Sequence, residues 1–274
     1  MVLPNGPESK YIETHGLRLH YLDWGSSHLP PMLLLHGLQD CAHLWDHFAA
    51  AMRNQYHVMA LDHRGHGDSP WTDPEAYKLA DYVAELKGLI EALDLKGLFL
   101  MGHSAGSKNA WIYIAENPGR VARLVITDMD PDSVNPGSKE MISRYKDESD
   151  EYDSLDVVVE RLRDRARLAS DDILRHHAEH MTRALPNGKL VWKRDRHVVT
   201  HYDRPDAWHY LPKVNVPTLI VRGSISTLLT GPVARRMNEE IPDCRLVELE
   251  GGHHWAHHEF PDQYEQAVRE FLDN

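Results

Sequence analysis

Apolar residues recur along the chain in short runs, separated by longer segments of helical periodicity. In the longer segments, such as 82–93 and 105–117, apolar residues return every three or four positions, which predicts amphipathic helices. Strands that alternate with helices predict an α/β fold, in which a mostly parallel sheet is covered on both faces. Residues 10–23 are expected to form an antiparallel edge. The expected strands are 17–24, 31–37, 56–62, 97–102, 123–130, 218–223 and 244–251.

The alternation lapses between Pro131 and Leu211. This stretch begins with the turn-rich sequence PDSVNPGS and continues with charged helical sequence such as SLDVVVERLRDRARLA. An insertion after the sixth strand of such a pattern is expected to form a lid over the carboxyl edge of the sheet, where open α/β sheets bind ligands. The predicted division is a core of residues 1–131 and 212–274 and a helical lid of residues 132–211.

Composition narrows the range of partners. The chain has 274 residues, 42% of them hydrophobic, and a formal net charge of −12, which would repel nucleic-acid phosphates and anionic membranes. No stretch approaches the roughly 18 apolar residues of a membrane span, and the first residues do not resemble a signal peptide. Cys41 and Cys244 are too few for a disulfide framework. We expect a cytoplasmic protein without nucleic-acid or membrane partners, for which a homodimer is possible.

One apolar run leads into the sequence GHSAG, in which Gly102 and Gly106 flank Ser104 between a predicted strand and a predicted helix. The sequence matches the GxSxG nucleophile elbow, whose strained turn needs small neighbours and exposes the serine hydroxyl; the alternative is an ordinary turn. A second run ends in LLLHGLQD. If its strand lies beside that of Ser104, the amides of Leu38 and Ala105 are expected to form an oxyanion hole.

These motifs stand in a characteristic order with LDHRGHGDS at 61–69, PTLIVRG at 217–223 and GGHHWAHHEFP at 251–261. Together they resemble the α/β-hydrolase fold superfamily, in its lid-bearing serine-esterase-like branch, over almost the whole chain. The resemblance assigns the catalytic base to His254, with His253 as the alternative. It gives the loop at 61–69 a structural part and no chemistry.

The resemblance leaves the third catalytic residue less obvious. Many members place a carboxylate shortly after the strand that ends at Gly223, but residues 223–229 contain none, and Ser226 occupies the usual position. Some relatives place the acid after the preceding strand, where this chain has several aspartates. The favoured candidate is Asp128, followed by Asp130, with Asp132 the third aspartate there.

Ser104, His254 and Asp128 suit hydrolysis of a carboxylic ester or lactone through an acyl-enzyme, with no cofactor and no metal. A small-molecule ester or lactone is therefore the expected substrate. Hydrolysis of a carbon–carbon bond in a dienone-type substrate uses the same residue types and stays open. So does a ligand-binding receptor or a lyase on the same fold.

A histidine-rich segment, HHAEH, has the HxxEH spacing of inverted zinc peptidases, with His176 and His180 one helical turn apart and Glu179 between them. With 20 histidines in the chain, such spacing arises easily by chance. The favoured interpretation is a solvated helix face.

Overall fold

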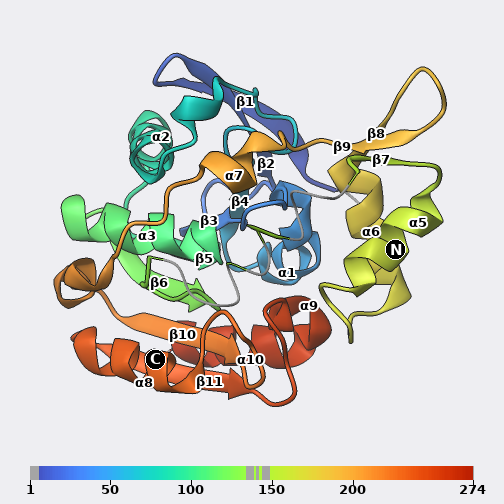
Figure 1. The fold of residues 1–274 in the computed structure, drawn as a ribbon. Coiled ribbons are helices and arrows are strands. Elements are labelled where there is room, and N and C mark those ends of the chain that lie inside the picture. Colours follow the sequence, from blue (N-terminus) through green and yellow to red (C-terminus); the bar gives the residue numbers. More distant parts are fainter. Residues whose placement is uncertain (1–5, 134–138, 140–141, 144–148, 274) are drawn as a thin grey trace.

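The structure is a computed structural model that describes residues 6–133, 139, 142–143 and 149–273. Its core is an eight-stranded sheet (Figure 1). The strands are β1 (Glu8–Thr14), β2 (Leu17–Asp23), β3 (Pro31–Leu35), β4 (His57–Leu61), β5 (Leu98–His103), β6 (Val121–Thr127), β10 (Thr218–Gly223) and β11 (Cys244–Leu249).

The strand order is β1-β2-β4-β3-β5-β6-β10-β11. β1 pairs antiparallel with β2 over the register Glu8–Asp23 to Thr14–Leu17, and β2 pairs antiparallel with β4. The remaining pairs are parallel. The predicted α/β class, the mostly parallel sheet and its antiparallel edge are confirmed. Because the central strands are parallel, their carboxyl ends share one edge, where the loops after β3, β5, β6 and β10 meet.

Alternate residues of each strand face opposite layers of helices. Leu33 and Leu35 of β3 belong to one apolar cluster, and Met32 and Leu34 to the other. The first cluster contains side chains of α2 (Leu79–Ala92), α3 (Ala105–Glu116) and α8 (Gly231–Glu240). The second contains those of α1 (Asp46–Met52) and α10 (Pro261–Leu272). The remaining short helices of the core are η1 (Ala42–Trp45), η2 (Pro74–Ala76), η3 (Trp208–Lys213) and α9 (Ala256–Glu259).

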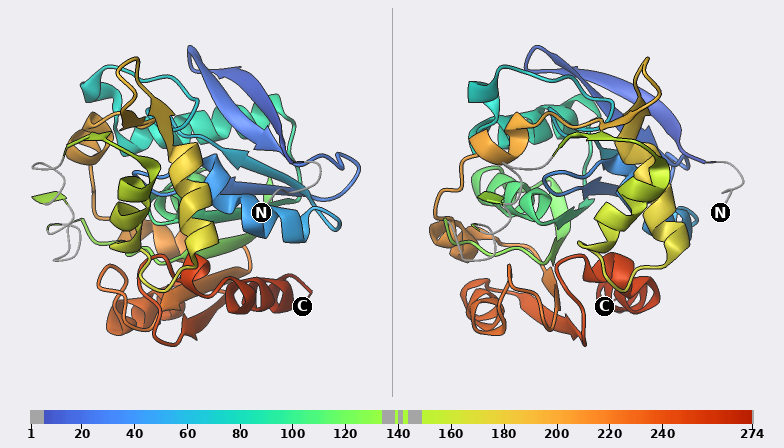
Figure 2. Two further views of the ribbon diagram at one scale, coloured as in Figure 1. Left: turned by 90° about the vertical axis from the view of Figure 1, so that its right-hand side faces the viewer. Right: turned by 45° about the vertical axis from the view of Figure 1, so that its right-hand side comes forward.

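The described residues of the segment 132–207 lie outside the large sheet and are referred to below as the insertion. They include three helices, two of which pack side by side, and a small antiparallel sheet of order β7-β9-β8 (Figure 2). The sequence predicts helices in this segment but not the small sheet, because strands of two or three residues are too short to show a periodic pattern. The elements are β7 (Glu151–Tyr152), α5 (Leu155–Arg163), α6 (Asp171–Met181), β8 (Thr182–Ala184), β9 (Leu190–Trp192) and α7 (His197–His201).

The insertion packs on the core through its own apolar cluster. Leu174 and Ala178 of α6 lie in this cluster together with Cys41, which directly precedes η1, and Leu44, which belongs to η1. Among the described residues, no helix combines the length and the apolar character that a membrane crossing requires.

Candidate active site

β5 ends in a tight turn that presents Ser104. This residue has φ 53° and ψ −126°, in a region where residues other than glycine are strained, and it directly precedes α3. A Cβ on Gly102 would lie 2.4 Å from the carbonyl carbon of Gly106, and one on Gly106 would lie 2.5 Å from the carbonyl oxygen of Leu35. The GxSxG pattern therefore has a steric cause, and the turn places Ser104 on the wall of a cavity.

His254 lies in the loop after β11 and faces Asp128, which directly follows β6. His254 Nδ1 donates a hydrogen bond to Asp128 Oδ1 at 2.8 Å. Because a carboxylate can only accept, the ring carries a proton on Nδ1, and in the neutral ring Nε2 has a free lone pair. His254 lines the same cavity as Ser104.

Two further donors hold the carboxylate of Asp128, which is fully buried. Ser226 Oγ donates to Oδ1 at 2.6 Å, and the amide of Gly223 donates to Oδ2 at 3.0 Å. Both belong to the end of β10 and the turn after it. The position at which the sequence lacks a carboxylate thus supplies hydrogen bonds to the carboxylate of Asp128. A Cβ on Gly223 would lie 2.2 Å from the carbonyl oxygen of Gly252, so only glycine lets the His254 loop approach this closely.

The alternative residues have other surroundings. His253 Nδ1 lies 3.1 Å from Glu259 Oε1 rather than against Asp128. Asp130 lines the cavity, and Asp132 Oδ1 accepts a hydrogen bond from Trp208 Nε1 at 2.7 Å.

Leu38 and Ala105 both line the cavity, and β3 lies beside β5, as the expected oxyanion hole requires. Ala105 is the first residue of α3, and the first amides of a helix have no acceptor within it. In the part of the chain that the structure describes, the amides of Leu38 and Ala105 donate to no other group. The oxyanion hole formed by these two amides stays a prediction.

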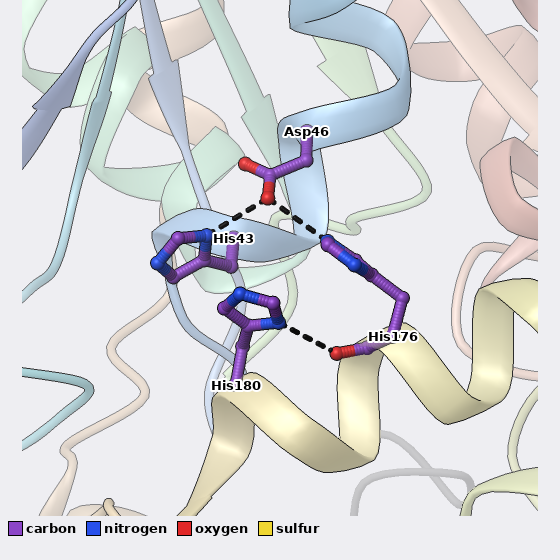
Figure 3. Close-up of side chains that lie close together, drawn as sticks. All are labelled: His43, Asp46, His176 and His180. Atoms are coloured by element: carbon purple, nitrogen blue, oxygen red, sulfur yellow. Dashed lines mark hydrogen bonds and ion pairs between the residues drawn. The ribbon is translucent and has the colours of Figure 1, made fainter. Parts of the chain in front are cut away.

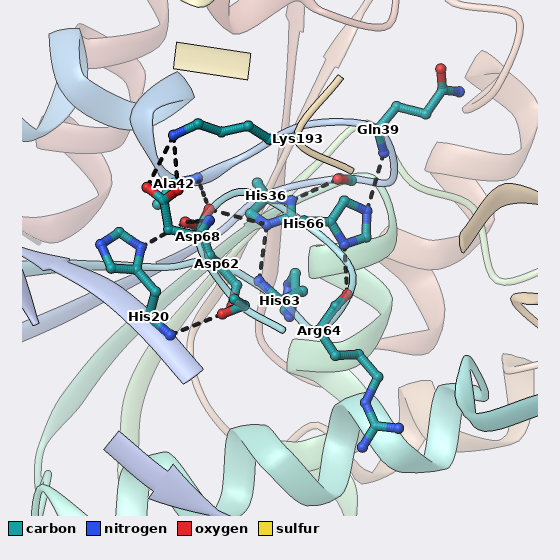
Figure 4. Close-up of polar contacts among 12 residues, drawn as sticks. His20, His36, Gln39, Ala42, Asp62, His63, Arg64, His66, Asp68 and Lys193 are labelled. Carbon is teal, nitrogen blue, oxygen red and sulfur yellow. Dashed lines mark hydrogen bonds and ion pairs between the residues drawn. The ribbon is translucent and has the colours of Figure 1, made fainter. Parts of the chain in front are cut away.

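A buried polar network holds the loop that carries Leu38 (Figure 4). His36 Nε2 accepts a hydrogen bond from the amide of His63 at 3.1 Å, and His66 Nε2 accepts one from the amide of Gln39 at 3.3 Å. Burial lowers the pKa of His66 to about 3, so this ring is neutral and can act as an acceptor.

Asp62 is the anionic centre of this network (Figure 4). Its Oδ2 accepts from His20 Nδ1 at 2.6 Å and from the amide of Asp68 at 3.0 Å, and its Oδ1 accepts from the amide of Ala42 at 2.7 Å. Burial alone would raise the pKa of Asp62, but the hydrogen bond from His20 lowers it to about 2. Through these hydrogen bonds the loop at 61–69 holds the neighbouring segment that contains Leu38, which is a structural role.

His103 is a residue that sequence reasoning missed. Its Nε2 donates to the backbone oxygen of His254 at 3.0 Å, and Asp40 Oδ2 lies 3.5 Å from its Nδ1. Burial lowers the pKa of His103, although Asp40 opposes this, which favours a neutral ring. His103 therefore ties the His254 loop to β5. The sequence holds no signal for this contact beyond adjacency to Ser104, because the partners are 151 positions apart.

Two cations that line the cavity were also missed: Lys108, which is buried, and Arg204, which is partly buried. The cavity has a volume of ≈ 40 Å³. Lys108 lies one helical turn after Ser104, and its Nζ donates to the backbone oxygen of Asp132 at 3.0 Å. Arg204 of the insertion donates to the backbone oxygen of Tyr202 at 2.9 Å. Burial lowers the pKa of both groups, that of Lys108 to about 8. Helical spacing from Ser104 could have identified Lys108, whereas only the tertiary fold brings Arg204 here.

Comparisons with known proteins place this geometry in context. A family model described as the alpha/beta hydrolase fold matches residues 30–261. The mouse sn-1-specific diacylglycerol lipase ABHD11 is 26% identical over 98% of this chain and 89% of its own length. Mouse epoxide hydrolase 4 is 34% identical, but the match spans only 45% of this chain and 34% of that protein.

A third relative is similar in both sequence and structure. The 2-(acetamidomethylene)succinate hydrolase of Mesorhizobium japonicum is 25% identical over 97% of this chain and 95% of its own length. The crystal structure of E-2-(acetamidomethylene)succinate hydrolase superposes with a TM-score of 0.91, covering 98% of this chain and 100% of that one at 24% identity. The structural likeness shows the fold.

Proposed function

The chain belongs to the alpha/beta hydrolase family, and from this premise we propose that it is a serine hydrolase that cleaves a carboxylic ester or lactone through an acyl-enzyme intermediate. The observation that carries the proposal is a strained serine elbow that shares a cavity with a histidine hydrogen-bonded to a buried aspartate.

In the proposed mechanism, Ser104 Oγ attacks the substrate carbonyl carbon while His254 Nε2 takes the hydroxyl proton. Asp128 keeps the ring in the required tautomer and stabilises its charged form. The amides of Leu38 and Ala105 donate to the developing oxyanion. The tetrahedral intermediate collapses and expels the alcohol, which receives the proton from His254. Water, deprotonated by His254, then attacks the acyl-enzyme; the bond from Ser104 Oγ to the acyl carbon breaks, His254 returns the proton to Oγ, and the carboxylic acid leaves.

The residue at the elbow supports this chemistry over its nearest alternative. Epoxide hydrolysis in similar folds uses a carboxylate nucleophile, whereas this chain has serine at position 104. A serine forms an ester with an acyl group, which water can hydrolyse with the help of the same histidine. The likeness to ABHD11, a lipase by its name, agrees with ester cleavage.

The cavity favours a small acyl group. Its volume of ≈ 40 Å³ leaves little room beside Ser104, and part of its wall comes from Tyr202 and Arg204 of the insertion. We therefore propose that the insertion covers the site as a lid and restricts the length of the acyl chain.

A substrate panel tests the proposed reaction. Nitrophenyl acetate, butyrate and palmitate, a small lactone and a dienone should be supplied to the wild type and to Ser104→Ala. We expect turnover of the short ester or the lactone by the wild type and background rates with Ser104→Ala. Turnover of the dienone alone would replace ester cleavage by carbon–carbon hydrolysis. Equal rates in both proteins would refute the nucleophile.

A further inference from the structure

Four side chains from the core and the insertion meet outside the catalytic cavity (Figure 3). His43 belongs to η1 and Asp46 begins α1, whereas His176 and His180 lie one turn apart on α6. Each offers one nitrogen or oxygen, and these four atoms all lie within 4.8 Å of one another. We refer to these residues as the His/Asp cluster.

The HxxEH segment therefore differs from its favoured interpretation as a solvated face. The side chain of His176 is only 26% exposed, and His177 is buried. Glu179 is exposed, so it is not part of the cluster and the arrangement of an inverted zinc peptidase does not form. The third and fourth members come instead from His43 and Asp46, more than a hundred residues earlier in the chain.

Asp46 provides a buried negative charge at the centre of the cluster. Its Oδ2 accepts hydrogen bonds from His43 Nδ1 at 2.8 Å and from His176 Nε2 at 2.9 Å. Its Oδ1 accepts no hydrogen bond from the described residues, and solvent cannot supply one readily because the side chain is almost wholly buried. A buried carboxylate with one unpaired oxygen is costly, and a cation bound to the group would offset part of that cost.

His180 is oriented to offer a lone pair. Its Nδ1 donates to the backbone oxygen of His176 at 2.8 Å, and since a carbonyl oxygen only accepts, the proton of the neutral ring is on Nδ1. Nε2 is then free, and the ring lies 3.9 Å from that of His43 between centroids. A backbone hydrogen bond that fixes the opposite nitrogen is typical of histidine ligands.

We propose that His43, Asp46, His176 and His180 bind Zn²⁺ or a similar transition-metal ion, which clamps α6 of the insertion to the core. Three imidazoles and one carboxylate form a tetrahedral donor set that zinc accepts and that Mg²⁺ and Ca²⁺, which prefer oxygen, do not. Tetrahedral bonds of about 2.0–2.1 Å place ligand atoms about 3.3 Å apart, so the contacts to Asp46 need to open only slightly.

Binding is balanced in protons. Zn²⁺ takes the place of the two protons that His43 and His176 donate to Asp46. If the ring of His43 or His176 is neutral, its displaced proton is replaced from solvent by one on the other ring nitrogen. If the ring is protonated, binding releases that proton to solvent.

The surroundings allow an ion to enter and give it a structural effect. A cavity of ≈ 220 Å³, separate from that of Ser104, is lined by two members of the cluster, Asp46 and His176. α6 already packs on η1 through Leu174 and Leu44. A bound ion would add a direct link across this contact without touching the catalytic residues.

The site is tested by calorimetric titration of the full chain, treated first with a chelator, with ZnCl₂. MgCl₂ is the metal control. The absorbance of bound Co²⁺ reports whether the geometry is tetrahedral. We expect one equivalent of Zn²⁺ to bind and Tm to rise by about 5 °C when free Zn²⁺ is about 100 times Kd. His180→Ala and Asp46→Asn should each weaken binding by at least about 10²-fold, because outer-sphere partners alone are worth 10–100-fold.

The chain offers a matched control in His201→Ala. His197 and His201 are also one turn apart on a helix, and His197 contacts Asp195, but among the described residues this pair belongs to no group that could hold a metal ion. This variant should bind Zn²⁺ like the wild type. The proposal is overturned if the wild type binds no Zn²⁺, or if both His180→Ala and Asp46→Asn retain wild-type affinity. It is also overturned if His201→Ala alone abolishes binding.

Discussion

Asp128 and Asp46 are both buried carboxylates that accept hydrogen bonds from histidine, yet their surroundings differ. Both oxygens of Asp128 are used, by His254, Ser226 and the amide of Gly223. Asp46 receives two imidazoles on Oδ2 and none of the described donors on Oδ1. The first carboxylate is bound on all sides and can hold one ring in one orientation.

The carboxylate of Asp46 has one oxygen without a hydrogen-bond donor among the described residues and lies among several imidazole rings. The same two residue types therefore support different functions according to the remaining donors: orientation of a base at Asp128, and capture of a cation at Asp46.

The largest effect is expected from Asp128→Asn. The change keeps the shape but removes the charge and can favour the wrong tautomer of His254, an effect of about 10⁴ in the serine-protease example. We expect kcat/KM for a short ester to fall by at least about 10². Asp130→Asn and Asp132→Asn should cost little by comparison. If Asp130→Asn is crippled while Asp128→Asn stays within a few-fold of the wild type, the acid is Asp130.

Lys108 extends the comparison to a buried cation in the catalytic cavity. Burial lowers its pKa to about 8, below the unfolded value of about 10.4. Between these values the unfolded chain binds more protons, so the free energy of unfolding rises with pH there, and the full burial penalty applies below pH 8. We expect Lys108→Met to stabilise the protein by about 2 kcal/mol at pH 7, about 5 °C in Tm, and by much less at pH 10.

Thermal melts of the wild type and Lys108→Met at both pH values measure this difference. Lower stability of Lys108→Met at pH 7 would mean that the contacts of the ammonium group outweigh its desolvation.

Ser226→Ala removes one of the three donors to Asp128. A hydrogen bond to a charged group contributes about 1.5–3 kcal/mol, but His254 and Gly223 still hold the carboxylate. We therefore expect a loss of about 10-fold in kcat for the short ester, with KM unchanged. Ser226→Thr, which keeps the hydroxyl, is the control and should recover most of the rate. Equal losses in both variants would indicate a packing effect.

The smallest effect on turnover is expected from Asp46→Asn. The His/Asp cluster is separate from the catalytic cavity, so ester hydrolysis by this variant, and by the wild type after chelator dialysis, should stay within about twofold of the untreated wild type. Steady-state rates at 25 °C check this. A large loss restored by Zn²⁺ would connect the two carboxylates that we treat as independent.

Most of the sheet and the serine elbow could be predicted from the sequence, because both depend on local patterns. Apolar runs mark the strands, and the steric demand of the turn at Ser104 appears directly as Gly102 and Gly106. The short strands of the insertion could not be predicted, since two or three residues have no period.

Contacts that join distant segments were also out of reach of periodicity. The link from His43 to His176 depends on how α6 packs against η1, which spacing within either segment does not encode. From the sequence, position 226 was noted only because it lacks the usual carboxylate. In the structure the Ser226 hydroxyl lies 2.6 Å from Asp128 Oδ1.

The central claim is that Ser104 is the nucleophile, and covalent labelling tests it most directly. The wild type and Ser104→Ala should be treated with a serine-directed alkyl phosphonate, digested and examined by mass spectrometry. We predict a single phosphonylated peptide containing residues 98–111, modified at Ser104, and no label on this peptide in Ser104→Ala. A label on another residue, or an unlabelled wild type that still hydrolyses esters, would contradict the account.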